Sequence, residues 1–222
     1  MAKIKFQRFL VNDLELKHEI PVAPLSPKAL KIIEAASKLF LSNGFGSVSM
    51  DAIAKHANVS KPTLYSHFHD KETLFSEIMG TMCKNAGGNQ VLETLQEEKG
   101  SPREVLIKVG RTKLDLILNW QGLSLARIVF AETTRFPSLG QTFWENGPKH
   151  YYDALEIYLG RLHDEEILKV PNPATSTMKF DGMLMWGFIF PLLLGVIPLP
   201  TEREINDHVD GVVDDFLRIH AP

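Results

Sequence analysis

Residues 48–68 read VSMDAIAKHANVSKPTLYSHF, and HDKETLF follows at residues 69–75. The pattern predicts two short helices joined by a tight turn. Helices that cross at a steep angle need a small side chain at the crossing point, and Ala54 meets this need. Four residues later, Asn58 tolerates the positive φ that such a turn requires. The stretch therefore predicts a helix-turn-helix.

Hydroxyl and carboxylate side chains indicate where the helices around this motif begin. Ser49 and Ser60 are N-cap candidates for the second and third helices, because their hydroxyls can accept hydrogen bonds from free backbone N–H groups. A first helix is expected to begin after Ser26, which precedes a proline, and to end at Gly44. Asp70 can cap a fourth helix. Four helices are thus expected in this part of the chain.

The rest of the chain predicts further helices and no series of strands. Capping boxes at residues 101–104 and 201–204 open two of these helices, the first reaching about residue 120. Residues 87–88 and 97–100 are expected to be loops. The prediction is an all-α protein with three parts, which are a flexible N-terminal extension (1–25), a helix-turn-helix domain (26–80) and a larger helical domain (81–222).

The third helix of the motif is expected to leave polar side chains on its outer side. The apolar side chains that fill the core shared with the second helix are Ile53, Ala57, Val59, Leu64 and Phe68. A helix presented in this way can enter the major groove of DNA, with its N-terminal residues at base edges. The expected DNA contacts are Ser49, Lys61, Thr63, Tyr65, Ser66, His67 and Lys71.

Six of these seven side chains have a particular expected role. Lys61 and Thr63 are close enough to the N-terminus of the helix to reach base edges. Tyr65 and His67 can donate hydrogen bonds to phosphates. Ser49 and Lys71, at the starts of the second and fourth helices, could hold the DNA backbone on either side, since helix N-termini favour anions.

The charge distribution agrees with this function. The whole chain has a net charge of −3, but residues 1–80 hold ten Lys or Arg and eight Asp or Glu, a net charge of +2. Residues 26–71 hold six basic and three acidic side chains. Local positive charge, rather than the total, decides whether a surface attracts phosphates.

The run AASKLFLSNGFGSVSMDAIAKHANVSKPTLYSHFHDKETLF resembles the DNA-binding domain of the tetracycline-repressor (TetR) family of bacterial regulators. Asn58 stands where that family usually has glycine. The resemblance implies a homodimer that presents two recognition helices to a palindromic operator on double-stranded DNA. It also implies a helical C-terminal domain that binds a small-molecule effector and dimerises through its last two helices. The expected function is a transcriptional repressor that leaves its operator when the effector binds.

Aromatic and methionine side chains in the C-terminal domain are abundant enough to line an apolar cavity, although such residues more often belong to a core. The candidate effector-binding residues are Arg111, Trp120, Phe130, Trp144, Tyr151, Met183 and Trp186, with Arg111 as a polar anchor. The identity and polarity of the effector stay open. An alternative is a DNA-binding regulator or architectural protein that answers to a protein partner and has no small-molecule ligand.

Other classes of function are disfavoured. No nucleophile elbow, phosphate-binding glycine loop or metalloprotease motif is present, so neither an enzyme nor a cofactor is expected. His56, His67 and His69 lack the partners of a metal site. Residues 182–201 carry no charge, but prolines and glycines interrupt them, and they are expected to form a core or subunit-interface helix rather than a membrane span. A single cysteine favours the cytoplasm.

Overall fold

The computed structural model describes residues 25–85, 88–97 and 100–222, and these ranges contain eleven α-helices and no strand. The helices are α1 (Pro27–Asn43), α2 (Met50–His56), α3 (Lys61–His67), α4 (Lys71–Asn85), α5 (Gly88–Glu97), α6 (Pro102–Ile117), α7 (Trp120–Glu132), α8 (Pro137–Asn146), α9 (Pro148–Asp164), α10 (Pro173–Leu194) and α11 (Glu202–Ile219). The prediction of an all-α fold is confirmed. The expected flexible extension falls almost entirely outside the described residues.

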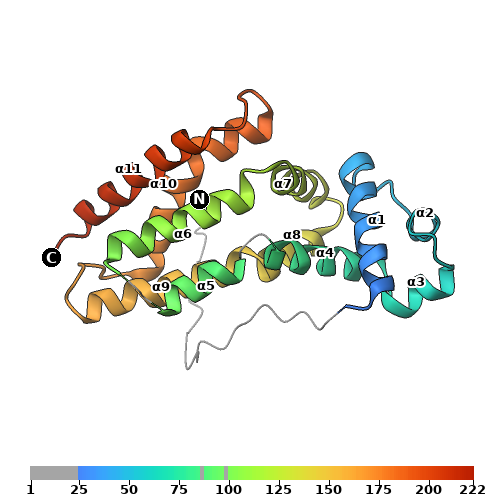
Figure 1. Ribbon diagram of the computed structural model, residues 1–222, viewed down its shortest axis with the longest axis horizontal. Coiled ribbons are helices and arrows are strands. Elements are labelled where there is room, and N and C mark those ends of the chain that lie inside the picture. The colour runs from blue at the N-terminus through green and yellow to red at the C-terminus, as the bar shows by residue number, and fades with distance from the viewer. Residues whose placement is uncertain (1–24, 86–87, 98–99) are drawn as a thin grey trace, which may run out of the picture.

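The molecule is elongated, with α1, α2 and α3 together at one end of its long axis (Figure 1). Helices α10 and α11 lie side by side in the other half of the molecule, where α11 packs on α6 and α10 packs on α9. Helices α4, α7 and α8 lie between the two regions, because α4 packs on α8 while both α4 and α7 contact α1. These three helices therefore connect the two ends of the molecule.

The predicted helix starts are confirmed by their caps. The hydroxyls of Ser26, Ser49 and Ser60 accept hydrogen bonds from Ala29, Ala52 and Thr63 backbone N–H groups, respectively. Both predicted capping boxes are present, at the starts of α6 and α11. The motif's turn contains Asn58 at φ 54°, as predicted.

The chain differs from expectation at two places in its middle. The helix expected to reach about residue 120 ends at Ile117, and α7 begins three residues later. Asn119 explains the break, since its side-chain oxygen accepts from the Gly122 N–H and its side-chain nitrogen donates to the Leu116 carbonyl. Helix α5 occupies the stretch between the two expected loops, where no helix is predicted.

The buried apolar residues form two clusters. One lies among α5, α6, α9, α10 and α11, with Phe180 and Phe216 in edge-to-face contact. The other is built around α1 to α4, where Phe40, Phe45 and Phe75 are fully buried. This second cluster also takes in Leu125, Ile128 and Val129 of α7 and Leu139 of α8. The helix-turn-helix region therefore shares one continuous core with helices from the C-terminal part of the chain.

Helix α10 is long and apolar enough to cross a membrane by length and composition, and 28% of its most apolar window is buried. The helix packs against α9 and α11, so part of its apolar surface is covered within the fold. The rest is open: Trp186 is 69% exposed, and its ring stacks on that of Phe190 at 5.5 Å between centroids. An apolar helix packed on other helices with one bare face is typical of a subunit interface.

Candidate DNA-binding helix and internal cavity

Helix α3 separates apolar from polar side chains. Leu64 and Phe68 are buried in the core beneath it. Tyr65, Ser66 and His67 are exposed on its outer side. Residues three to four positions apart lie on the same side of a helix. The spacing of the apolar residues in the sequence therefore accounts for this division once the apolar side is packed. The outer side offers hydroxyl and imidazole groups that can donate to phosphates or reach base edges.

The N-terminal turn of α3 carries two more of the predicted contacts. Thr63 is half-buried, and its hydroxyl lies 2.8 Å from that of Ser60. Lys61 is exposed and forms an ion pair of 2.5 Å with Asp51 of α2. An exposed pair of this kind contributes little to stability, so the ammonium is available to a stronger anion such as a DNA phosphate. Ser49 is also exposed, at the start of α2.

Lys71 lies differently from the prediction. Its ammonium donates hydrogen bonds to the carbonyl oxygens of Phe45 at 2.8 Å and Val48 at 3.0 Å, in the loop between α1 and α2. It also lies 4.3 Å from the centre of the Phe45 ring. Burial lowers the pKa of this lysine, against the attraction of Glu72 and Glu132. These contacts give Lys71 a structural role in holding the loop, instead of the expected contact with the DNA backbone.

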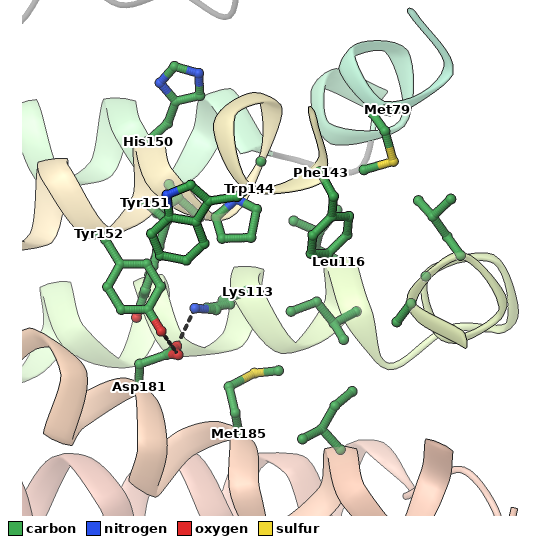
Figure 2. A pocket seen from close by; sticks show the side chains of 18 of the residues that line it. Met79, Lys113, Leu116, Phe143, Trp144, His150, Tyr151, Tyr152, Asp181 and Met185 are labelled. Carbon is green, nitrogen blue, oxygen red and sulfur yellow. Dashed lines mark hydrogen bonds and ion pairs between the residues drawn. The ribbon is translucent and has the colours of Figure 1, made fainter. Parts of the chain in front are cut away.

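A cavity of about 520 Å³ lies in the C-terminal region, a volume that suits a drug-sized ligand. Helices α6, α7, α8, α9 and α10 all line it, α5 contributes Val91 and Leu92, and α4 contributes Met79 (Figure 2). The lining residues of α7 are Gln121, Gly122, Leu125, Ala126 and Phe130. Phe130 is 74% exposed, so the cavity reaches the surface beside α7.

Three of the seven predicted effector-binding residues line this cavity: Phe130, Trp144 and Tyr151. Arg111 lies elsewhere, since it donates to the Glu202 carbonyl oxygen and so ties α6 to α11. Met183 packs against the core, and Trp186 is exposed on α10. The Trp120 side chain lies outside the described residues. The apolar spacing of α10 cannot distinguish a cavity from a core or an outer face, which explains why Met183 and Trp186 were misplaced.

The polar centre of the cavity is absent from the predicted set. Lys113 of α6 forms an ion pair with Asp181 of α10, and the Tyr152 hydroxyl of α9 donates to the same carboxylate (Figure 2). Burial lowers the pKa of Lys113 to about 8, although Asp181 opposes the shift. The spacing of the sequence could have indicated that Lys113 is buried, because it follows Leu106 and Val109 on the buried side of its helix.

The tyrosines of this cluster are strongly perturbed. Burial raises the pKa of Tyr151 well above its ordinary value, and the nearby Asp181 carboxylate adds to the shift. Burial and the hydrogen bond to Asp181 raise the pKa of Tyr152 as well. Both phenols are therefore neutral hydrogen-bonding groups at physiological pH. In the part of the chain that the structure describes, no three His, Cys, Asp or Glu side chains gather in a metal-binding arrangement.

The N-terminal and C-terminal parts of the chain both match known families of transcriptional regulators. Residues 32–78 match the family described as bacterial regulatory proteins of the tetR family. Residues 104–222, more than half of the chain, match the C-terminal domain of AefR-like transcriptional repressors. The HTH-type transcriptional regulator AcrR of Shigella flexneri is 40% identical over 196 residues, which are 84% of this chain and 87% of that protein.

Solved structures show the same architecture. A TetR-family transcriptional regulator from Mesorhizobium loti superposes with a TM-score of 0.77 at 26% identity, covering 88% of this chain and 97% of that one. The flavonoid-responsive regulator FrrA superposes with a TM-score of 0.70 at 30% identity over the same shares of the two chains. The chain therefore belongs to the TetR family of bacterial transcriptional regulators and is a sequence-specific DNA-binding regulator of transcription.

Proposed function

We propose that this regulator is a homodimeric repressor that leaves a palindromic operator when a small molecule enters the cavity. The observation that carries the proposal is a physical link between the cavity and the DNA-binding end. Helix α7 lines the cavity along most of its length, and Glu132 at its end accepts a hydrogen bond of 2.9 Å from the Gly46 N–H, just ahead of α2. A ligand that shifts α7 would therefore pull on the helix-turn-helix.

A second contact follows the same path. The Phe136 ring, just after α7, meets the Phe45 ring edge-to-face at 5.2 Å between centroids. Phe45 is also one of the residues held by Lys71 at the start of α4. Thus α7 and α4 both contact the loop between α1 and α2, and Met79 of α4 lines the cavity. The effect on operator affinity can be no larger than the ligand's differential affinity for the two arrangements.

The proposed DNA contacts lie on the outer side of α3 and at the start of α2. They comprise Ser49, Lys61, Thr63, Tyr65, Ser66 and His67, with Lys71 left out because its ammonium is held by backbone carbonyls. In a dimer, two such helices about 34–36 Å apart would fit half-sites one turn of DNA apart. A cytoplasmic location follows from a target on bacterial DNA.

A homodimer through α10 and α11 is supported by apolar surface that the single chain leaves bare. The exposed large apolar side chains of this region are Met178, Trp186, Phe190, Leu194, Val196, Ile197, Leu199 and Ile219. A second copy of the chain would cover them and keep two recognition helices in register. Sedimentation velocity of the wild-type chain and the Trp186→Glu variant tests this part: we expect a dimer for the first and a weakened dimer for the second.

The function itself is tested by selecting operator fragments from the source genome and titrating them in gel shifts. We expect a palindromic site, and we expect compounds that bind the cavity to release the regulator from that site. A compound that occupies the cavity without changing operator affinity would contradict the switch. The cavity favours a small-molecule effector over the alternative of a protein partner, which needs no internal space.

A further inference from the structure

The two buried charges in the cavity neutralise each other. The Lys113 ammonium pairs with one oxygen of the Asp181 carboxylate, and the Tyr152 hydroxyl donates to the other. The ammonium also lies 3.4 Å from the centre of the Tyr151 ring. These groups come from α6, α9 and α10, so three helices hold the cluster rigid (Figure 2). One positive and one negative charge are thus neutralised before any ligand arrives.

This arrangement penalises a charged ligand. Both Lys113 and Asp181 are buried, and a buried charge is tolerated only when it is paired. A carboxylate entering the cavity would have to compete with Asp181 for Lys113, and an ammonium would meet a carboxylate whose two oxygens are both engaged. Either ion would leave one buried charge without a partner. An uncharged ligand avoids this cost.

Tyr151 lines the cavity, but its hydroxyl is not open to it. That oxygen is fully buried and has no hydrogen-bond partner among the described residues. A ligand therefore meets no free hydrogen-bonding group in this cluster.

Apart from Asn119, Gln121 and His150, the rest of the lining is apolar and rich in flat or polarisable groups. Trp144 packs against Tyr152 at 5.3 Å between ring centroids, and Phe143, Met79 and Met185 face the same space (Figure 2). Aromatic faces and methionine sulfurs contact aromatic rings favourably. The lining therefore suits a planar aromatic body better than a flexible aliphatic chain.

From these observations we propose that the effector is an uncharged aromatic compound that lies among the aromatic and methionine side chains beside the Lys113–Asp181 pair. The inference rests on the effector role proposed above and adds the chemical class. The similar protein FrrA is a flavonoid-responsive regulator.

Four naphthalene probes test the class directly by isothermal titration calorimetry at neutral pH and in the absence of DNA: naphthalene, 2-naphthol, 2-naphthoate and 2-naphthylmethylammonium. We expect both uncharged probes to bind, and we expect both ions to bind at least about tenfold more weakly than 2-naphthol, because each ion adds an unpaired buried charge. If either ion binds as tightly as the uncharged probes, or if no probe binds, the proposal is overturned.

Two variants assign the effect to the named groups. Asp181→Asn removes the charge that neutralises Lys113, so the ratio of affinities should shift toward 2-naphthoate. Lys113→Met should shift the ratio toward the ammonium probe. Unchanged ratios in both variants would overturn the proposal, and circular dichroism checks that each variant is folded.

The probe results are separable from the proposed function. If the carboxylate probe binds best and releases the operator, the chemical class is wrong and the ligand-released repressor stands. If 2-naphthol binds as expected but no cavity ligand alters operator affinity, the chemical class stands and the switch fails.

Discussion

The Gly46 backbone N–H donates a hydrogen bond of 2.9 Å to the carboxylate of Glu132, although the two residues are 86 positions apart. Gly46 lies in the loop that leads into α2, and Glu132 is the last residue of α7. A side chain at position 46 would meet the Glu132 carboxylate at 3.1 Å and the Arg135 guanidinium at 3.2 Å. The two segments are therefore in close contact, and glycine allows it.

Glu132→Ala removes this contact, and we expect it to lower the free energy of unfolding by about 1 kcal/mol, because the Gly46 N–H loses its partner. We also expect a smaller difference between operator affinities with and without a cavity ligand. Glu132→Gln keeps an acceptor oxygen and is the matched control, with a smaller loss of both. Urea unfolding and gel shifts measure the two effects. An unaltered ligand response in Glu132→Ala would argue against coupling through α7.

Lys61 and Lys71 form a matched pair, since both are lysines at the first residue of a helix. We expect Lys61→Met to weaken operator binding and to reduce the salt dependence of binding by about one counterion per lost phosphate contact. Lys71→Met should leave the salt dependence unchanged. It should instead lower the free energy of unfolding by about 1–3 kcal/mol, because the Phe45 and Val48 carbonyls lose their donor. A reduced salt slope for Lys71→Met would restore the original prediction of a phosphate contact.

Tyr65→Phe and His67→Ala test the outer side of α3. Both side chains are exposed, so each change should alter the free energy of unfolding by less than about 0.5 kcal/mol. Each should weaken operator binding roughly tenfold or more, since a dimer would lose two hydrogen bonds of about 1 kcal/mol each. Arg218→Ala on α11 removes an exposed charge far from α3 and is the control. Fluorescence anisotropy with a labelled operator measures the affinities, and equal values for all variants would exclude α3 as the reading helix.

Lys113 and Asp181 should be strongly interdependent. Asp181→Leu leaves a buried lysine without its partner, so we expect a loss of about 3–5 kcal/mol in the free energy of unfolding. Adding Lys113→Met removes the unpaired group, and the double variant should recover most of the loss. Chemical denaturation of the wild type, both single variants and the double variant gives the coupling energy. Additive losses would mean that the two side chains do not act as a pair.

The same lysine predicts a dependence of stability on pH. Burial lowers the pKa of Lys113 to about 8 in the folded protein, from 10.5 for a free lysine. Below pH 8 the lysine is protonated in both states and its contribution is constant. Between about pH 8 and 10 the unfolded chain binds more protons than the folded protein, so the free energy of unfolding should rise, by at most about 1.4 kcal/mol per pH unit.

Urea unfolding of wild type and Lys113→Met over this pH range measures the rise, which should be absent in the variant. Above pH 10 the trend should reverse, because burial raises the pKa of Tyr151 and Tyr152 and these phenols keep protons that the unfolded chain loses. Identical pH profiles for the two proteins would show that Lys113 is not the titrating group.

The sequence by itself determined the helix-turn-helix motif and the starts of the helices that carry it. Ser26, Ser49 and Ser60 bond to backbone N–H groups three residues away, so each cap depends only on its neighbours in the chain. Asn58 adopts the positive φ of the turn because asparagine itself tolerates this backbone conformation. The outer side of α3 followed from the spacing of its apolar residues. All of these features are set by interactions between residues that are close together in the sequence, so the sequence is enough to predict them.

Only the tertiary structure decided the roles of residues whose partners are distant in the chain. Lys71 bonds to a loop more than twenty residues earlier in the chain, Lys113 pairs with a carboxylate 68 residues away, and Glu132 bonds to Gly46. An apolar or charged residue at helical spacing is equally compatible with a core, a cavity or an outer face. The choice among them is made by the helices that pack against it, because burial and a distant partner set the energy of each side chain.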